Sequence, residues 1–106
     1  MLPAGLAAVA AEKGEDCRHT CAAAGRTCAA DGFASINTCD HLRAHFECEA
    51  GCGTAAAQDS APAYVAFAVP KGQFPSMCFT AAANAKPTCD TSSASLLRLC
   101  PCSASS

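Results

Sequence analysis

Hydrophobic and polar residues alternate in short blocks along this chain, and Gly, Pro and small polar residues separate the blocks. The first helical block runs from Glu15 to Gly25; Asp16 is placed to cap it, and Gly25 suits the position after its last turn. Cys17 and Cys21 are four residues apart and share one face of the predicted helix. A disulfide between these two positions is geometrically unfavourable, so we expect each cysteine to bond to another segment.

A second helical block is expected from Asn37 to Cys48, with Asn37 as its cap. One side of this helix carries Cys39, Leu42, Arg43 and Phe46. Before it, Asp31 and Gly32 form a predicted turn, and the buried anchors that follow are Phe33 and Ile36. After it, Gly51 and Gly53 end the helix around Cys52, and residues 53–63 read as a small-residue loop.

Two later blocks have strand composition. Tyr64–Val69 alternates and is closed by Pro70, and Ser76–Ala81 is expected to pair with it through the connection between them. Residues 96–102 are expected to form a last extended segment. The predicted fold class is therefore small disulfide-rich α+β, with two short helices, a small antiparallel sheet and about five disulfides.

Cysteine usage determines how such a chain can be stable. Ten of 106 residues are cysteine, whereas large apolar side chains are few: five Phe, one Tyr and no Trp. A domain of this size buries only about 60–65% of its unfolded surface, and each disulfide adds about 2–4 kcal/mol. We expect every cysteine to be bridged: Cys17, Cys21, Cys28, Cys39, Cys48, Cys52, Cys78, Cys89, Cys100 and Cys102. Their pairing stays open, and their number indicates an oxidising compartment, secretory, extracellular or an organelle lumen such as the thylakoid lumen.

The proline between Cys100 and Cys102 makes a bridge between those two residues very strained. We therefore expect them to hold the C-terminal segment onto two other segments at once.

Residues 1–16 form an apolar N-terminal segment, ahead of a single cysteine-rich domain at 17–102 and a tail at 103–106. The first eleven residues fall short of the roughly 20 that span a bilayer. They end like a signal peptide, with Ala8-Val9-Ala10 as a small-residue site, but lack a charged start. The segment is either a targeting remnant or packed N-terminus, or an apolar arm that docks on a partner.

Cysteine spacing also suggests a relationship. The motifs are C-x3-C-x6-C from Cys17 and C-x10-C-x10-C-P-C from Cys78, with Phe79 after Cys78 and Arg98 two residues before Cys100. This ordered set resembles the cysteine-rich C-terminal region of family 18 glycosyltransferases, the alpha-1,6-mannosyl-glycoprotein 6-beta-N-acetylglucosaminyltransferases. The resemblance implies a secretory-pathway origin and a disulfide-locked α/β appendage. With 106 residues there is no room for that family's catalytic domains, so it implies a detached module and transfers no catalytic residue.

Few patterns in the sequence favour catalysis or a cofactor. A net charge of -2 with scattered Lys and Arg argues against nucleic acid. His41 and His45, four residues apart, are an alternative pair of zinc ligands, but zinc would compete with disulfides for sulfur, so we expect neither metal nor cofactor. The chain has no redox C-x-x-C, no G-x-S-x-G and no standard glycosylation sequon, so we predict that it is not an enzyme.

Three functions remain as hypotheses. The favoured one is a non-catalytic, disulfide-stapled module that docks as an accessory subunit on a larger protein or membrane complex from an oxidising lumen, a thylakoid-lumen photosystem-type subunit being one version. The second is a glycosyltransferase-derived module with a glycan- or enzyme-associated role, although the aromatic residues for a glycan site are few. The third is a secreted disulfide-rich inhibitor or effector. Candidate surface residues are Leu2, Leu6, Val9 and Phe74.

Overall fold

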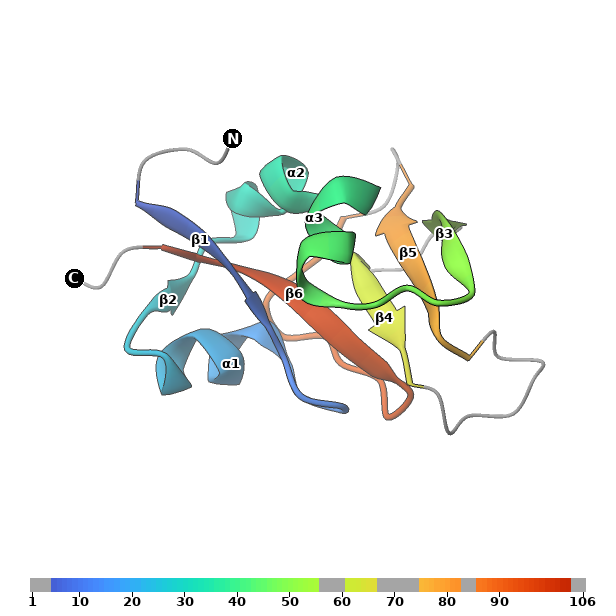
Figure 1. The fold of residues 1–106 in the computed structure, drawn as a ribbon. Helices are drawn as coiled ribbons and strands as arrows, with labels where there is room; N and C mark the ends of the chain where they lie inside the picture. Colours follow the sequence, from blue (N-terminus) through green and yellow to red (C-terminus); the bar gives the residue numbers. More distant parts are fainter. Residues whose placement is uncertain (1–4, 56–60, 67–74, 83–85, 104–106) are drawn as a thin grey trace.

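The computed structural model describes residues 5–55, 61–66, 75–82 and 86–103, which form helices packed on a mixed sheet (Figure 1). In chain order the elements are β1 (Leu6–Ala10), α1 (Cys17–Ala23), β2 (Thr27–Cys28), the 3-10 helix η1 (Ala30–Gly32), α2 (Phe33–Ile36), α3 (Cys39–His45), β3 (Gly51–Ala55), β4 (Ala63–Val65), β5 (Met77–Ala81) and β6 (Leu96–Ser103). The sheet order is β1-β6-β4-β5-β3, and β2 also pairs with β6. The predicted class, small disulfide-rich α+β, is confirmed.

β6, an eight-residue strand, pairs with three other strands of this sheet. It pairs antiparallel with β1 along one edge and with β4 and β2 along the other. Pro101 fits inside this strand because of where its nitrogen points. Its carbonyl accepts from the Ala29 N–H on the β2 side, so its missing N–H falls between the end of the β4 register at Arg98 and the start of the β2 register at Cys102.

The first predicted helix forms as the sequence indicated. The Asp16 carboxylate accepts from the His19 backbone N–H at 2.8 Å, which satisfies a free donor of the first turn of α1. After the helix, Gly25 has φ +73°, the left-handed conformation that glycine adopts without strain.

The second predicted helix is shorter than expected, and its cap is different. α3 spans Cys39–His45, and Thr38 rather than Asn37 caps it by accepting from the His41 N–H at 3.2 Å. The Asn37 side chain instead pairs with Ala81 of β5, donating to its carbonyl at 3.0 Å and accepting from its N–H at 2.6 Å. This amide satisfies both backbone groups of Ala81, so a long-range contact has displaced the local capping role.

The region before α3 is also more helical than predicted. The expected turn at Asp31 and Gly32 is η1, and it leads directly into α2. Phe33 and Ile36 of α2 are buried, as expected. A Cβ on Gly32 would lie 3.0 Å from both Leu6 Cδ1 and Pro101 Cβ, so glycine permits the close approach of η1 to the sheet.

The sheet is mixed, which corrects the prediction of an antiparallel one. β3 pairs parallel with β5, although Gly51–Ala55 was expected to end a helix and begin a loop. The sequence of β3 has weak strand propensity, so its pairing depends on tertiary contacts. β4 and β5 pair antiparallel, as predicted, and β4 covers Ala63–Val65. Residues 67–69 of the expected strand, and Pro70 after it, lie outside the described residues.

All ten cysteines are bridged, in two pairs of neighbouring disulfides and one further bridge. Cys39–Cys52 and Cys48–Cys78 attach α3 and its C-terminal end to β3 and β5, where Cys52 and Cys78 are paired neighbours. Cys28–Cys89 ties β2 to the segment before β6. Cys17–Cys100 and Cys21–Cys102 attach α1 to β6, and we call these two bridges the double staple.

The double staple corrects the expectation that Cys100 and Cys102 reach two different segments, because both bond to α1. The geometry explains why. Residues i and i+4 of a helix are separated by about 6.0 Å along its axis, and residues i and i+2 of a strand by about 6.6 Å. A C-x3-C helix face therefore matches a C-x-C strand face, and both bridges form while the helix lies along the strand. Cys17, Cys21, Cys100 and Cys102 are all fully buried, so sulfur makes up much of the core.

Candidate interaction surface

The structure places two of the four predicted surface residues in β1. Leu6 and Val9 are partly buried, and Val9 packs against the hydrophobic core. Leu2 and Phe74 lie outside the described residues. From Leu6 to Ala10 the apolar N-terminal segment is therefore a strand of the sheet rather than a separate arm.

β1 forms one end of the strand order, and its hydrogen-bonding groups divide into two sets. The Ala11 N–H donates to the Arg98 carbonyl at 2.8 Å, which fixes which residues of β1 face β6. By the alternation of antiparallel pairs, Ala7 and Val9 exchange hydrogen bonds with β6, whereas the N–H and C=O groups of Leu6, Ala8 and Ala10 point to the opposite side. Within the described ranges, no hydrogen bond to these outward groups is present. Leu6, Ala8 and Ala10 therefore present a row of outward-facing backbone N–H and C=O groups along an uncharged, apolar strand, and we call this row the open ladder.

A groove of about 390 Å³ runs between this strand and α1. Its lining residues are Val9, Ala10, Glu12, Glu15, His19, Thr20, Ala23 and Ala24. In Figure 1, α1 lies below β1 and β6, on the face of β6 from which Cys100 and Cys102 bond to it. Val9 of β1 and the small side chains of α1 make the apolar part of the groove, and the two glutamates make one end acidic.

His19 at the rim of this groove is coupled to the helix cap. Its Nδ1 lies 2.8 Å from Asp16 Oδ1, and this contact with the carboxylate raises the pKa of His19 above its ordinary value. The pKa of Asp16 is lowered, mainly by the hydrogen bond from the His19 backbone N–H. The exposed side chains of Glu12 and Glu15 line this same end of the groove, beside His19.

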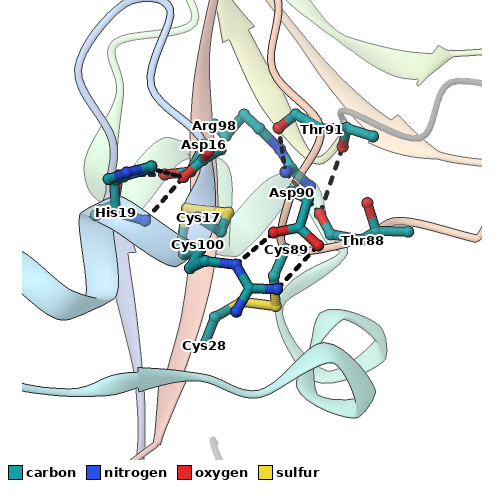
Figure 2. Close-up of polar contacts among 12 residues, drawn as sticks. Asp16, Cys17, His19, Cys28, Thr88, Cys89, Asp90, Thr91, Arg98 and Cys100 are labelled. Atoms are coloured by element: carbon teal, nitrogen blue, oxygen red, sulfur yellow. Dashed lines mark hydrogen bonds and ion pairs between the residues drawn. A yellow bond between two sulfur atoms is a disulfide. The ribbon is translucent and has the colours of Figure 1, made fainter.

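The helical wall of the groove is fixed from its far side. Arg18 of α1 pairs with Asp90, with Nη2 at 2.9 Å from Oδ2. Asp90 follows Cys89 of the Cys28–Cys89 disulfide, and Figure 2 shows its carboxylate close to that bridge. The Arg18 backbone N–H also donates to the Cys89 carbonyl at 3.0 Å. The ion pair with Asp90 lies on the surface and contributes little stability alone, but with the bridges it limits movement of α1 relative to the sheet.

A buried arginine holds the same segment to β6. Arg98 is fully buried, and its Nη1 donates to the carbonyls of Thr88 and Thr91 at 2.7 Å each; Figure 2 shows these three residues together. Its guanidinium lies 5.1 Å from the centre of the Phe33 ring. In the sequence, Arg98 stands out only as part of the cysteine motif. No local pattern distinguishes a buried arginine from an exposed one, because its partners are carbonyls distant in space.

The alternative zinc ligands lie together on α3. His41 is partly buried with its Nδ1 2.8 Å from Thr38 Oγ1, and His45 is exposed. The nearest cysteines in sequence, Cys39 and Cys48, are in disulfides. In the part of the chain that the structure describes, no group of three or more potential ligands comes together.

Two of the aromatic residues, Phe46 and Tyr64, are engaged with each other rather than free to receive a sugar. Phe46 and Tyr64 stack with ring centres 5.2 Å apart and planes 6° from parallel. The Tyr64 hydroxyl donates to Glu49 at 2.7 Å; burial and then this carboxylate raise the pKa of Tyr64, and the tyrosine lowers the pKa of Glu49. Through this stacking, Phe46, the residue that follows α3, packs against β4.

Models of known protein families give no match to this sequence, and no curated protein matches it. The resemblance to family 18 glycosyltransferases therefore stays a prediction from cysteine spacing. Among the described residues, no helix has the length and apolar character needed to cross a membrane. The five disulfides indicate an oxidising environment, secreted or lumenal.

Sequence reasoning found Leu6 and Val9 but missed the residues that make the surface a groove. Ala8 and Ala10 contribute backbone groups, which composition does not reveal. Glu12 and Glu15 were visible as the first charges after an apolar run, but only the fold places them beside α1.

Proposed function

We propose that this protein is a non-catalytic interaction module that docks on a larger protein in an oxidising compartment through β1 and the groove beside it. The observation that carries the proposal is the open edge of β1: five uncharged residues with three outward-facing backbone pairs. Such an edge is a template for pairing with another chain, and proteins usually protect it with charges, proline or a covering element.

The disulfides support this role because they keep the surface in one shape before binding. The double staple fixes α1 against β6, and β1 pairs with the same strand. Both walls of the groove are thus attached to one strand, and a preorganised surface loses less conformational entropy on association. A docking subunit of this kind suits the lumen of the secretory pathway or of an organelle such as the thylakoid.

Co-purification from the source cells tests the proposal. The chain carries an affinity tag at its C-terminal end, and a variant with Ala8→Pro is compared with Ala8→Val. Proline removes an N–H that points away from β6, so the fold is retained while the open ladder is interrupted. We expect a stoichiometric partner with the natural chain and with Ala8→Val, and its loss with Ala8→Pro. A chain that is recovered alone in all three forms contradicts the proposal.

A further inference from the structure

We propose that the β1 edge accepts an extended segment of the partner as an added antiparallel strand, with alternate side chains in the groove against α1 and a lysine or arginine beside Glu12 and Glu15. This inference rests on the proposed function and specifies the chemistry of the partner.

The form of the partner follows from the hydrogen-bonding groups. Leu6, Ala8 and Ala10 present N–H and C=O pairs about 6.8 Å apart, which is the repeat of a strand. A helix satisfies its own backbone groups internally and cannot engage such a ladder, whereas an extended chain meets all three pairs. Antiparallel addition has the better hydrogen-bond geometry.

The position of the groove determines which side chains are recognised. Val9 points to the α1 side of the sheet, together with Cys100 to which it is paired. A strand added outside β1 would direct every second side chain to this same side, into the space bounded by Thr20, Ala23 and Ala24. Since these wall residues are small, the groove has room for apolar side chains of the partner.

The two glutamates at one end of the groove determine which end of the bound segment should carry a basic residue. Glu12 and Glu15 lie just after β1, beside its Ala10 end, and an antiparallel segment begins at this end. A basic residue that precedes the apolar run would therefore meet the two carboxylates.

A second copy of this chain is a poorer match for the acidic end of the groove. If two β1 strands paired antiparallel about Ala8, the residue of the second copy opposite Ala11, next to Glu12, would be Gly5, which carries no side-chain charge. The acidic end of each groove would then have no partner, so a different, basic segment fits better.

Selection from a display library of random twelve-residue peptides tests the inference with the intact oxidised chain. We expect selected peptides to share a lysine or arginine followed by alternating apolar residues, and their binding to protect the amides of Leu6, Ala8 and Ala10 from hydrogen exchange. Binding should be lost in Ala8→Pro and in Ala10→Pro, which blocks the same edge if the first variant folds poorly, and retained in Ala8→Val. The double variant Glu12→Gln with Glu15→Gln should weaken binding about tenfold at low salt, because it removes two partly screened charge contacts.

Three results would overturn the inference: no peptide that competes at β1, selected peptides that still bind both proline variants, or acidic peptides among the selected set. These results are separable from a failure of the proposed function. A cellular partner that is lost with Ala8→Pro but is unaffected by the glutamine variants leaves the docking role standing, and shows that the added basic strand is wrong.

Discussion

Removing the double staple one bridge at a time tests whether its two disulfides act as one clamp. With Cys17–Cys100 intact, Cys21–Cys102 closes only a small ring, four residues of α1 and two of β6. The chain-entropy relation for a ring of about six residues gives about 2 kcal/mol, so replacing either pair by alanine should lower the free energy of unfolding by about that amount.

Removing both bridges should cost more than the sum. The next ring is then closed through Cys28–Cys89 and contains about 22 residues of chain, worth about 3.4 kcal/mol. The double loss is therefore expected at about 5.5 kcal/mol, roughly 1 kcal/mol beyond two single losses. The packing lost with each bridge is local. It therefore contributes equally to the double loss and to the sum of the two single losses, and it largely cancels when these two quantities are compared.

The assay is urea unfolding of the natural chain, the two single-bridge variants and the variant lacking both, all without reductant. Mass spectrometry of non-reduced digests confirms that the remaining bridges are native. Sucrose added equally to all four proteins raises their stability if the last variant is too unstable to measure. Strictly additive losses, or a double loss smaller than the sum, would refute the shared small ring.

Three other contacts give measurable expectations. Asp16→Ala should lower the free energy of unfolding by about 1 kcal/mol at pH 5.5 through loss of the cap. The pKa of Asp16 is lowered from 3.8 and that of His19 is raised from 6.5, so the stability contributed by their pair is fully present between these two pH values. This stability is lost as the pH falls through the folded pKa of Asp16, and also as it rises through the folded pKa of His19. Unfolding of the natural chain and of His19→Ala at several pH values will show the difference. Asn37→Ala should lower the free energy of unfolding by about 1–3 kcal/mol, because it leaves both backbone groups of Ala81 without their partner. A decrease below about 0.5 kcal/mol in urea unfolding would show that water replaces the amide. Arg98→Lys should lower the free energy of unfolding by about 1.5–3 kcal/mol and speed proteolysis near residue 90. The reason is that an ammonium cannot reproduce the planar guanidinium between Thr88, Thr91 and the Phe33 ring. Unchanged stability and cleavage would contradict this role.

Local signals in the sequence were sufficient for α1 and for the buried anchors. Asp16 and Gly25 act at positions set by the helix itself, so their roles depend on neighbours three to nine residues away. The spacing of Cys17 and Cys21 correctly excluded a bridge between them. It did not identify their common target, although the similar spacings of a C-x3-C helix and a C-x-C strand were available as a signal.

The features that the sequence did not reveal depend on contacts between distant residues. Asn37 has good capping chemistry, but Ala81 of β5, 44 residues away, competes for its amide. β3 has a glycine-rich sequence, and it is held as a strand by β5 and by the bridge from Cys52 to α3. The open edge of β1 is likewise a property of strand order, because the same five residues in the middle of a sheet would expose no ladder at all.

The register of β1 with β6 has a consequence for how this unit could be built into other proteins. Leu6 lies directly opposite Ser103, so the chain enters and leaves the fold at the same corner of the sheet, with Cα atoms about 5 Å apart. A surface loop of a host protein has a similar gap between its ends. The unit could therefore be inserted into such a loop without separating the flanking host segments, and it would project outward as a self-contained, cross-linked knob.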